Sequence, residues 1–90
     1  MALLSPAEAR ARMARLSGWT LEGDRLRKRY AHDSFASALA FVNKVGALAE
    51  AADHHPDILI EYRHVTLTLT THDSGGLTDR DFSLAAQIDA

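Results

Sequence analysis

Three of the five histidines in this chain lie where they could do acid and base chemistry. His54 and His55 precede Pro56, and His72 follows a run of alternating threonines. An imidazole has an unperturbed pKa near 6.5, so it can donate or accept a proton at physiological pH. His72 continues the register of the threonines, which places it on the accessible face of the predicted strand. We therefore expect three imidazoles to converge on one surface.

Composition excludes several other kinds of chemistry. The chain has 90 residues and no cysteine, which excludes disulfides, thiolate metal ligands and cysteine nucleophiles. A net charge of -2 argues against a dedicated nucleic-acid-binding protein. The longest uninterrupted apolar run, residues 38–42, is far shorter than the ~18 residues that a bilayer span needs. We expect a cytoplasmic protein with no nucleic-acid partner and no membrane segment.

Other interpretations of the same residues deserve comparison. His54 and His55 could be solvated turn residues, with His72 an ordinary strand end. A three-histidine zinc site is disfavoured because adjacent histidines do not easily point the same way. The segment 71–74 contains the residue types of a hydrolase triad, but the chain has no G-x-S-x-G elbow. The glycine pair at 75–76 lacks the Lys-Ser/Thr of a phosphate-binding loop.

The first third of the chain predicts a helix followed by a hairpin. Ser5 and Glu8 fit a capping box, and Gly18 ends the helix that this box begins. The segments 19–22 and 25–30 read as strands, and the Gly-Asp pair between them suits a tight turn. An antiparallel pair of strands should result.

The middle of the chain predicts a long helix and a second pair of strands. Apolar residues spaced three and four apart indicate an amphipathic helix over 35–52, capped by Asp33 or Ser34. Residues 58–62 and 65–70 then alternate between apolar and polar side chains, as strands do.

A final helix should begin near Thr78. Thr78 and Asp81 fit a capping box, and Leu77 and Phe82 fit a hydrophobic staple. These elements predict an α+β fold, with a four-stranded antiparallel sheet and three helices packed on one face. Residues 1–90 should form a single domain. So small a domain with open sheet edges favours oligomerisation.

The order and spacing of seven residues closely resemble the active-site signature of the pterin-4a-carbinolamine dehydratases. These residues are Glu50, His54, His55, Pro56, Tyr62, His72 and Asp81. The flanking sequence is similar too, in Gly18-Trp19, Thr71-His72, Gly76-Leu77-Thr78, Arg80-Asp81 and Leu84-Ala85. The similarity spans nearly the whole chain, and the fixed spacing makes it far more specific than a lone His-His-Pro.

The resemblance implies a dehydratase that needs no metal or redox cofactor. Members of the family remove water from 4a-hydroxytetrahydropterins, which gives the quinonoid dihydropterin of tetrahydropterin recycling. By resemblance the catalytic residues are His54, His55 and His72, with His54 and His72 as the acid/base pair and His55 mainly holding the pterin. The substrate-binding residues are Glu50, Pro56, Thr71, Asp73, Ser74 and Asp81. A homodimer or homotetramer is implied as well.

Some features leave alternatives open. The same fold could serve as a non-catalytic pterin-binding protein, or as a protein-dimerisation module like a transcriptional cofactor. Asp81 could cap the last helix or act in the active site, and Tyr62 fits an inward strand residue better than a substrate-stacking one. Trp19 suits the core or an interface.

Many relatives have Lys where this chain has Ala51, and an aromatic residue shortly after His-His-Pro where it has Ile58-Leu59, so pocket shape or substrate preference could differ. His32 and His64 lie outside the signature, and we expect both to face solvent.

Overall fold

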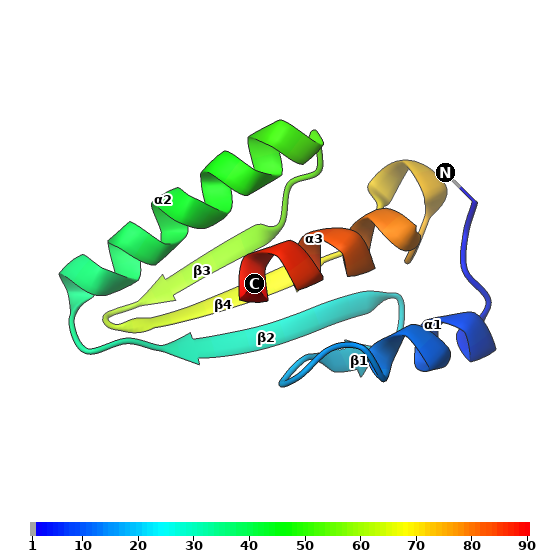
Figure 1. Ribbon diagram of the computed structural model, residues 1–90, viewed down its shortest axis with the longest axis horizontal. Coiled ribbons are helices and arrows are strands. Elements are labelled where there is room, and N and C mark those ends of the chain that lie inside the picture. Colours follow the sequence, from blue (N-terminus) through cyan, green and yellow to red (C-terminus); the bar gives the residue numbers. More distant parts are fainter. Residues whose placement is uncertain (1) are drawn as a thin grey trace.

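The chain folds in the order helix, strand pair, helix, strand pair, helix (Figure 1). The computed structural model describes residues 2–90, and Met1 lies outside the described residues. Its elements are α1 (Pro6–Met13), β1 (Thr20–Glu22), β2 (Arg25–Ala31), α2 (Phe35–Ala52), β3 (Asp57–Glu61), β4 (His64–Leu69), the 3-10 turn η1 (His72–Ser74) and α3 (Asp79–Asp89).

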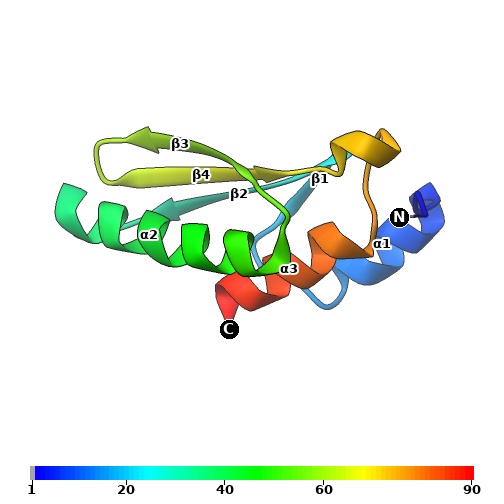
Figure 2. The same ribbon diagram turned by 90° about the horizontal axis from the view of Figure 1, so that it is seen from above.

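The strands form one antiparallel sheet in the order β1-β2-β4-β3. β4 lies between β2 and β3, so Leu67 pairs with Lys28 on one side and with Ile58 on the other. Helices α1, α2 and α3 all lie on one side of this sheet (Figure 2). The predicted α+β architecture is therefore confirmed, and β1 and β3 are its two open edges.

The alternation of β4 determines where the core lies. Val65, Leu67 and Leu69 are fully buried on the face that the helices cover. Val45 of α2 and Leu84 of α3 are almost completely removed from solvent as well. A strand with period-two alternation can bury one face only, so the intervening threonines lie on the other face.

Serine and threonine caps fix where the helices begin. Ser34, rather than Asp33, caps α2, since its side chain accepts a hydrogen bond from the backbone of Ser37. The predicted capping box between Thr78 and Asp81 is present at the start of α3. These caps satisfy backbone N–H groups that a helix otherwise leaves without partners.

The turn between β3 and β4 differs from the sequence prediction. Glu61 pairs with His64, which leaves Tyr62 and Arg63 as a two-residue turn. Tyr62 has a φ of 53° and is 70% exposed. The expectation of an inward strand residue is therefore wrong, because a two-residue hairpin turn requires positive φ at its first central position and points that side chain outward.

One carboxylate ties the end of α3 to the sheet. Asp89 accepts hydrogen bonds from Trp19 Nε1 at 2.7 Å, Tyr30 Oη at 2.6 Å and Lys28 Nζ at 3.1 Å. Burial alone would raise the pKa of Asp89, but the hydrogen bonds from these three donors lower it on balance. Burial and the bond to Asp89 raise the pKa of Tyr30. The folded state thus favours an ionised Asp89 beside a neutral Tyr30, and Trp19 lies in the core as predicted.

Helix α2 has one buried face and one exposed apolar face. Ala38, Val45 and Ala49 face the core, whereas Phe35 is 48% and Leu39 is 38% exposed. By length and composition alone the helix could cross a bilayer, with a mean hydropathy of 1.2 over 18 residues. A helix that packs on a sheet in a globular protein can have the same length and mean hydropathy as a helix that spans a bilayer.

Candidate active site

The three signature histidines meet at one end of the molecule, where α2 ends, η1 lies and α3 begins (Figure 1). They line a single pocket of about 170 Å³. Its full lining is Asp53, His54, His55, Thr70, Thr71, His72, Asp73 and Arg80. Convergence of the three imidazoles, which the sequence predicted, is therefore present in the structure.

The end of α2 positions His54. Asp53 adopts a left-handed conformation with a φ of 49°, and the backbone N–H of His54 donates to the carbonyl of Ala49 at 3.1 Å. This turn directs the His54 side chain inward, where it is 7% exposed. Its Nε2 lies 2.6 Å from Oδ1 of Asp81, which has no exposed surface. Such a short contact between buried partners is a strong, charge-assisted hydrogen bond.

The second oxygen of Asp81 belongs to the cap of α3. Oδ2 accepts from the Thr78 backbone N–H at 3.0 Å and from the Thr71 hydroxyl at 2.8 Å. The hydroxyls of Thr71 and Thr78 are themselves 2.9 Å apart. The two alternatives for Asp81 are thus compatible, because one oxygen caps the helix while the other holds the histidine.

His55 has a looser environment than its neighbour. Its Nε2 lies 3.3 Å from Oε2 of Glu50, and both side chains are more than half exposed. Solvent screening makes such a pair weak. Glu50 therefore orients His55 only, and it does not line the pocket itself.

His72 is exposed and stands at the start of η1. β4 ends at Leu69, so His72 is not the continuation of a strand, although the predicted exposure is confirmed. The Thr71 carbonyl accepts from the backbone N–H groups of Ser74 and Gly75 at 3.1 and 3.0 Å, and this turn fixes the backbone of His72. Within residues 2–90, no hydrogen bond or ion pair engages its imidazole, which is therefore free to contact a ligand.

The pocket and the predicted site differ at several positions. Thr71 and Asp73 line it as expected, whereas Pro56 and Ser74 do not. Arg80 lines it without having been assigned a role, and its guanidinium donates to the Asp53 carbonyl. In the sequence, only its position beside Asp81 in the first turn of α3 pointed to a place near the site. Helical periodicity does not show which way the Arg80 side chain points.

Histidines outside the signature behave differently from expectation. His32 does not face solvent, because its Nε2 is buried without a hydrogen-bond partner and its ring lies 4.8 Å from that of Phe41. His64 is half-buried on β4. Neither lines the pocket, and no group of three or more metal-ligating side chains gathers anywhere in residues 2–90.

Comparison with known proteins agrees with this geometry. Residues 2–90 match the family model of pterin 4 alpha carbinolamine dehydratase. A protein of that name from Roseiflexus castenholzii is 59% identical over 98% of this chain and 95% of its own length. Another from Trichormus variabilis is 54% identical over 96% of this chain and 92% of its own.

Two solved structures share the fold. A transcriptional coactivator/pterin dehydratase from Brucella melitensis superposes with a TM-score of 0.90 at 28% identity, covering 96% of this chain and 94% of the other. A pterin dehydratase-like protein identified as a RuBisCO assembly factor in the alpha-carboxysome superposes with a TM-score of 0.70 at 30% identity, covering 81% and 87%. The full-length matches confirm the resemblance, and the chain belongs to the pterin 4 alpha carbinolamine dehydratase family.

Proposed function

We propose that this protein removes water from a 4a-hydroxytetrahydropterin to give the quinonoid dihydropterin, by histidine acid/base catalysis. The observation that carries the proposal is the placement of a carboxylate-held His54 and an unpartnered His72 on one pocket. The elimination needs one group to protonate the departing hydroxyl and another to take the proton from N5. Two imidazoles in one pocket supply both groups.

The bond between His54 and Asp81 suggests how the two histidines divide the work. The Asp81 carboxylate accepts a hydrogen bond from Nε2–H of His54, which leaves Nδ1 as the nitrogen that exchanges a proton with substrate. The carboxylate also stabilises the imidazolium that forms when His54 accepts a proton. His54 is therefore suited to remove the N5 proton, and His72 to protonate the leaving hydroxyl.

The remaining predicted residues have binding roles in this proposal. His55 holds the pterin and is oriented by Glu50. Thr71 and Asp73 contribute pocket wall and hydrogen-bonding groups, while Pro56 and Ser74 shape the turns that precede and follow the histidines. Arg80 joins this set, because it lines the pocket beside His54.

The proposal is tested by turnover of the purified protein, with the 4a-hydroxy intermediate generated in place. We expect acceleration over the spontaneous dehydration, and its loss in the double variant His54→Gln, His72→Ala. Gln keeps a donor toward Asp81, so the buried carboxylate retains a partner. Retained turnover in the double variant would overturn the histidine mechanism. Wild-type protein that binds dihydropterin without turnover would instead support the non-catalytic alternative.

We also propose a homodimer or homotetramer. The edge strand β3 exposes Leu59 at 52% and Ile58 at 37%, and Phe35 and Leu39 of α2 expose further apolar surface. An open, apolar sheet edge pairs readily with a second copy.

Light scattering on the purified protein should give two or four times the 9.8 kDa chain mass. Leu59→Lys should lower that mass, whereas Thr20→Lys on the opposite edge strand should leave it unchanged. A wild-type monomer at micromolar concentration would contradict the proposal.

A further inference from the structure

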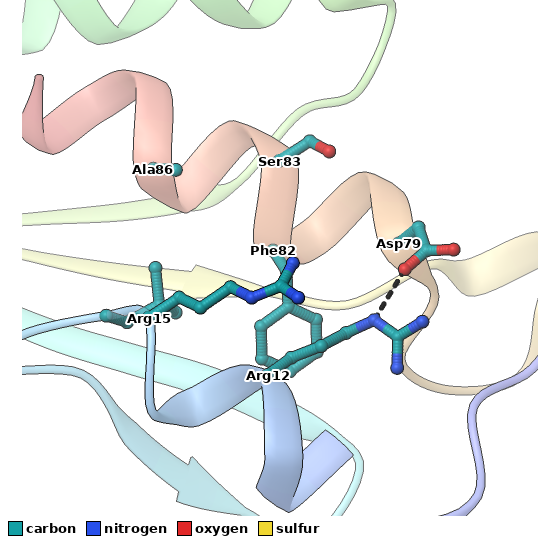
Figure 3. A pocket seen from close by; sticks show the side chains of 7 residues that line it. Arg12, Arg15, Asp79, Phe82, Ser83 and Ala86 are labelled. Atoms are coloured by element: carbon teal, nitrogen blue, oxygen red, sulfur yellow. Dashed lines mark hydrogen bonds and ion pairs between the residues drawn. The ribbon is translucent and has the colours of Figure 1, made fainter. Parts of the chain in front are cut away.

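A second pocket lies between α1 and α3 and has a volume of about 200 Å³ (Figure 3). It is lined by Arg12, Arg15, Leu16, Asp79, Phe82, Ser83 and Ala86. The α3 residues of this set are spaced three and four apart, so they form one stripe of the helix. None of the histidines lines this pocket, and its ligand is independent of the dehydratase proposal.

The charges of this pocket leave one cation without a partner. Arg12 Nε donates to Asp79 Oδ1 at 2.6 Å, so these two charges neutralise each other. The backbone N–H of Arg15 donates to the Arg12 carbonyl at 3.1 Å, but its guanidinium forms no ion pair or hydrogen bond with any residue between 2 and 90. In Figure 3 its side chain extends across the pocket toward α3, beside that of Arg12. The three groups carry a net charge of one positive unit, and the N-terminal end of α3 adds to the positive potential.

The walls below these arginines are apolar. Phe82 is 7% exposed as a whole residue and lines the pocket, and Leu16 and Ala86 continue the apolar wall. A ligand that contacts both the free guanidinium and the apolar wall needs an anionic group for Arg15 and an apolar portion for Phe82. One unpaired guanidinium matches the single charge of a carboxylate, whereas a doubly charged phosphate would leave one negative charge without a partner beside Asp79. The volume lies below the roughly 300–1,000 Å³ of pockets for drug-sized ligands, which restricts the ligand to a small molecule.

We propose that the pocket between α1 and α3 binds a small organic carboxylate. Its carboxylate pairs with Arg15, in the planar two-point geometry that guanidinium groups favour, and its apolar end lies against Phe82. The apolar contact gives affinity and the guanidinium gives the preference for an anion.

Phenylacetate is a suitable probe, with phenylacetamide as its uncharged counterpart. Titrated into the full-length protein and followed by NMR, phenylacetate should saturate with a dissociation constant on the order of 1 mM, as expected for a ligand of this size. The perturbed amides should lie near residues 12–16 and 82–86. Phenylacetamide should bind at least about tenfold more weakly, since it cannot form the charged pair.

Substitutions separate this site from others. Arg15→Gln should weaken phenylacetate binding about tenfold, whereas Arg10→Gln, in α1 but outside the pocket, should leave it unchanged. Ala86→Leu narrows the pocket without changing its charge and should weaken both probes. Equal binding of the two probes, no effect of Arg15→Gln, perturbation confined to the histidine pocket, or no saturation by about 20 mM would each overturn the proposal.

Discussion

His54→Gln is expected to lower kcat for pterin dehydration by about 10²–10⁴-fold, the contribution typical of a general acid or base. Glutamine retains a donor toward Asp81 at the end of its side chain, so the buried carboxylate keeps its partner and the melting temperature should change little. In the proposed mechanism, the variant removes the nitrogen that exchanges a proton with substrate. Steady-state kinetics together with a thermal melt separates the chemical effect from a structural one.

His55→Gln is the matched control, because the two histidines are adjacent and differ in burial and in partner. His55 is exposed and only loosely paired with Glu50, so its substitution should raise KM and leave kcat within about tenfold of the wild type. Equal losses of kcat in both variants would contradict the assignment of His54 as the proton acceptor.

Asp81→Asn should reduce both turnover and stability. The native carboxylate accepts three hydrogen bonds, one from His54 and two from the Thr71 hydroxyl and the Thr78 backbone. An amide offers a single acceptor oxygen, so either the imidazole or the helix cap then faces an N–H group. We expect a loss of about 10²–10⁴-fold in kcat, since the imidazole loses the ionised partner that fixes its tautomer. The lost cap should cost ~1 kcal/mol, or about 4–8 °C in melting temperature.

Asp79→Asn provides the comparison on the same helical turn. Asp79 is 60% exposed at its side chain and pairs with Arg12, so its loss should cost less than ~1 kcal/mol and leave kcat unchanged. A loss of kcat at Asp79 as large as at Asp81 would show that the effect comes from weakening α3 rather than from the bond to His54.

Local patterns in the sequence predicted most of the fold. The alternation around Leu67 identified β4, and the Thr78-Asp81 spacing located the start of α3, because both depend on residues close in the chain. Tyr62 was misplaced for the opposite reason. Its neighbours in the sequence favour a strand. The pairing of Glu61 with His64, which leaves Tyr62 in the turn, depends on how β3 and β4 align.

The sequence predicted which three histidines share a pocket, but not the contacts between the residues around them. Residue types and spacing indicated the three histidines and Asp81 through a family resemblance. The contact between His54 and Asp81 joins residues 27 positions apart, and it exists only because the sheet brings the end of α2 to the start of α3. Arg80 was missed because the direction of a side chain in a first helical turn depends on its tertiary neighbours.

The hydroxyl pair beside Asp81 allows only one arrangement of hydrogens. The Thr71 hydroxyl has a single proton, which it gives to Asp81, so Thr78 must donate its own proton to Thr71. The lone pairs of Thr78 then receive the backbone N–H of Arg80. These hydrogen bonds form a chain in which every donor points the same way. It runs from the Arg80 backbone through the Thr78 and Thr71 hydroxyls to the Asp81 carboxylate. Neither hydroxyl of this chain can rotate without leaving a buried donor or acceptor without a hydrogen-bond partner. The Asp81 carboxylate is thereby fixed through Oδ2, and its Oδ1 holds the His54 ring in one orientation within the protein itself.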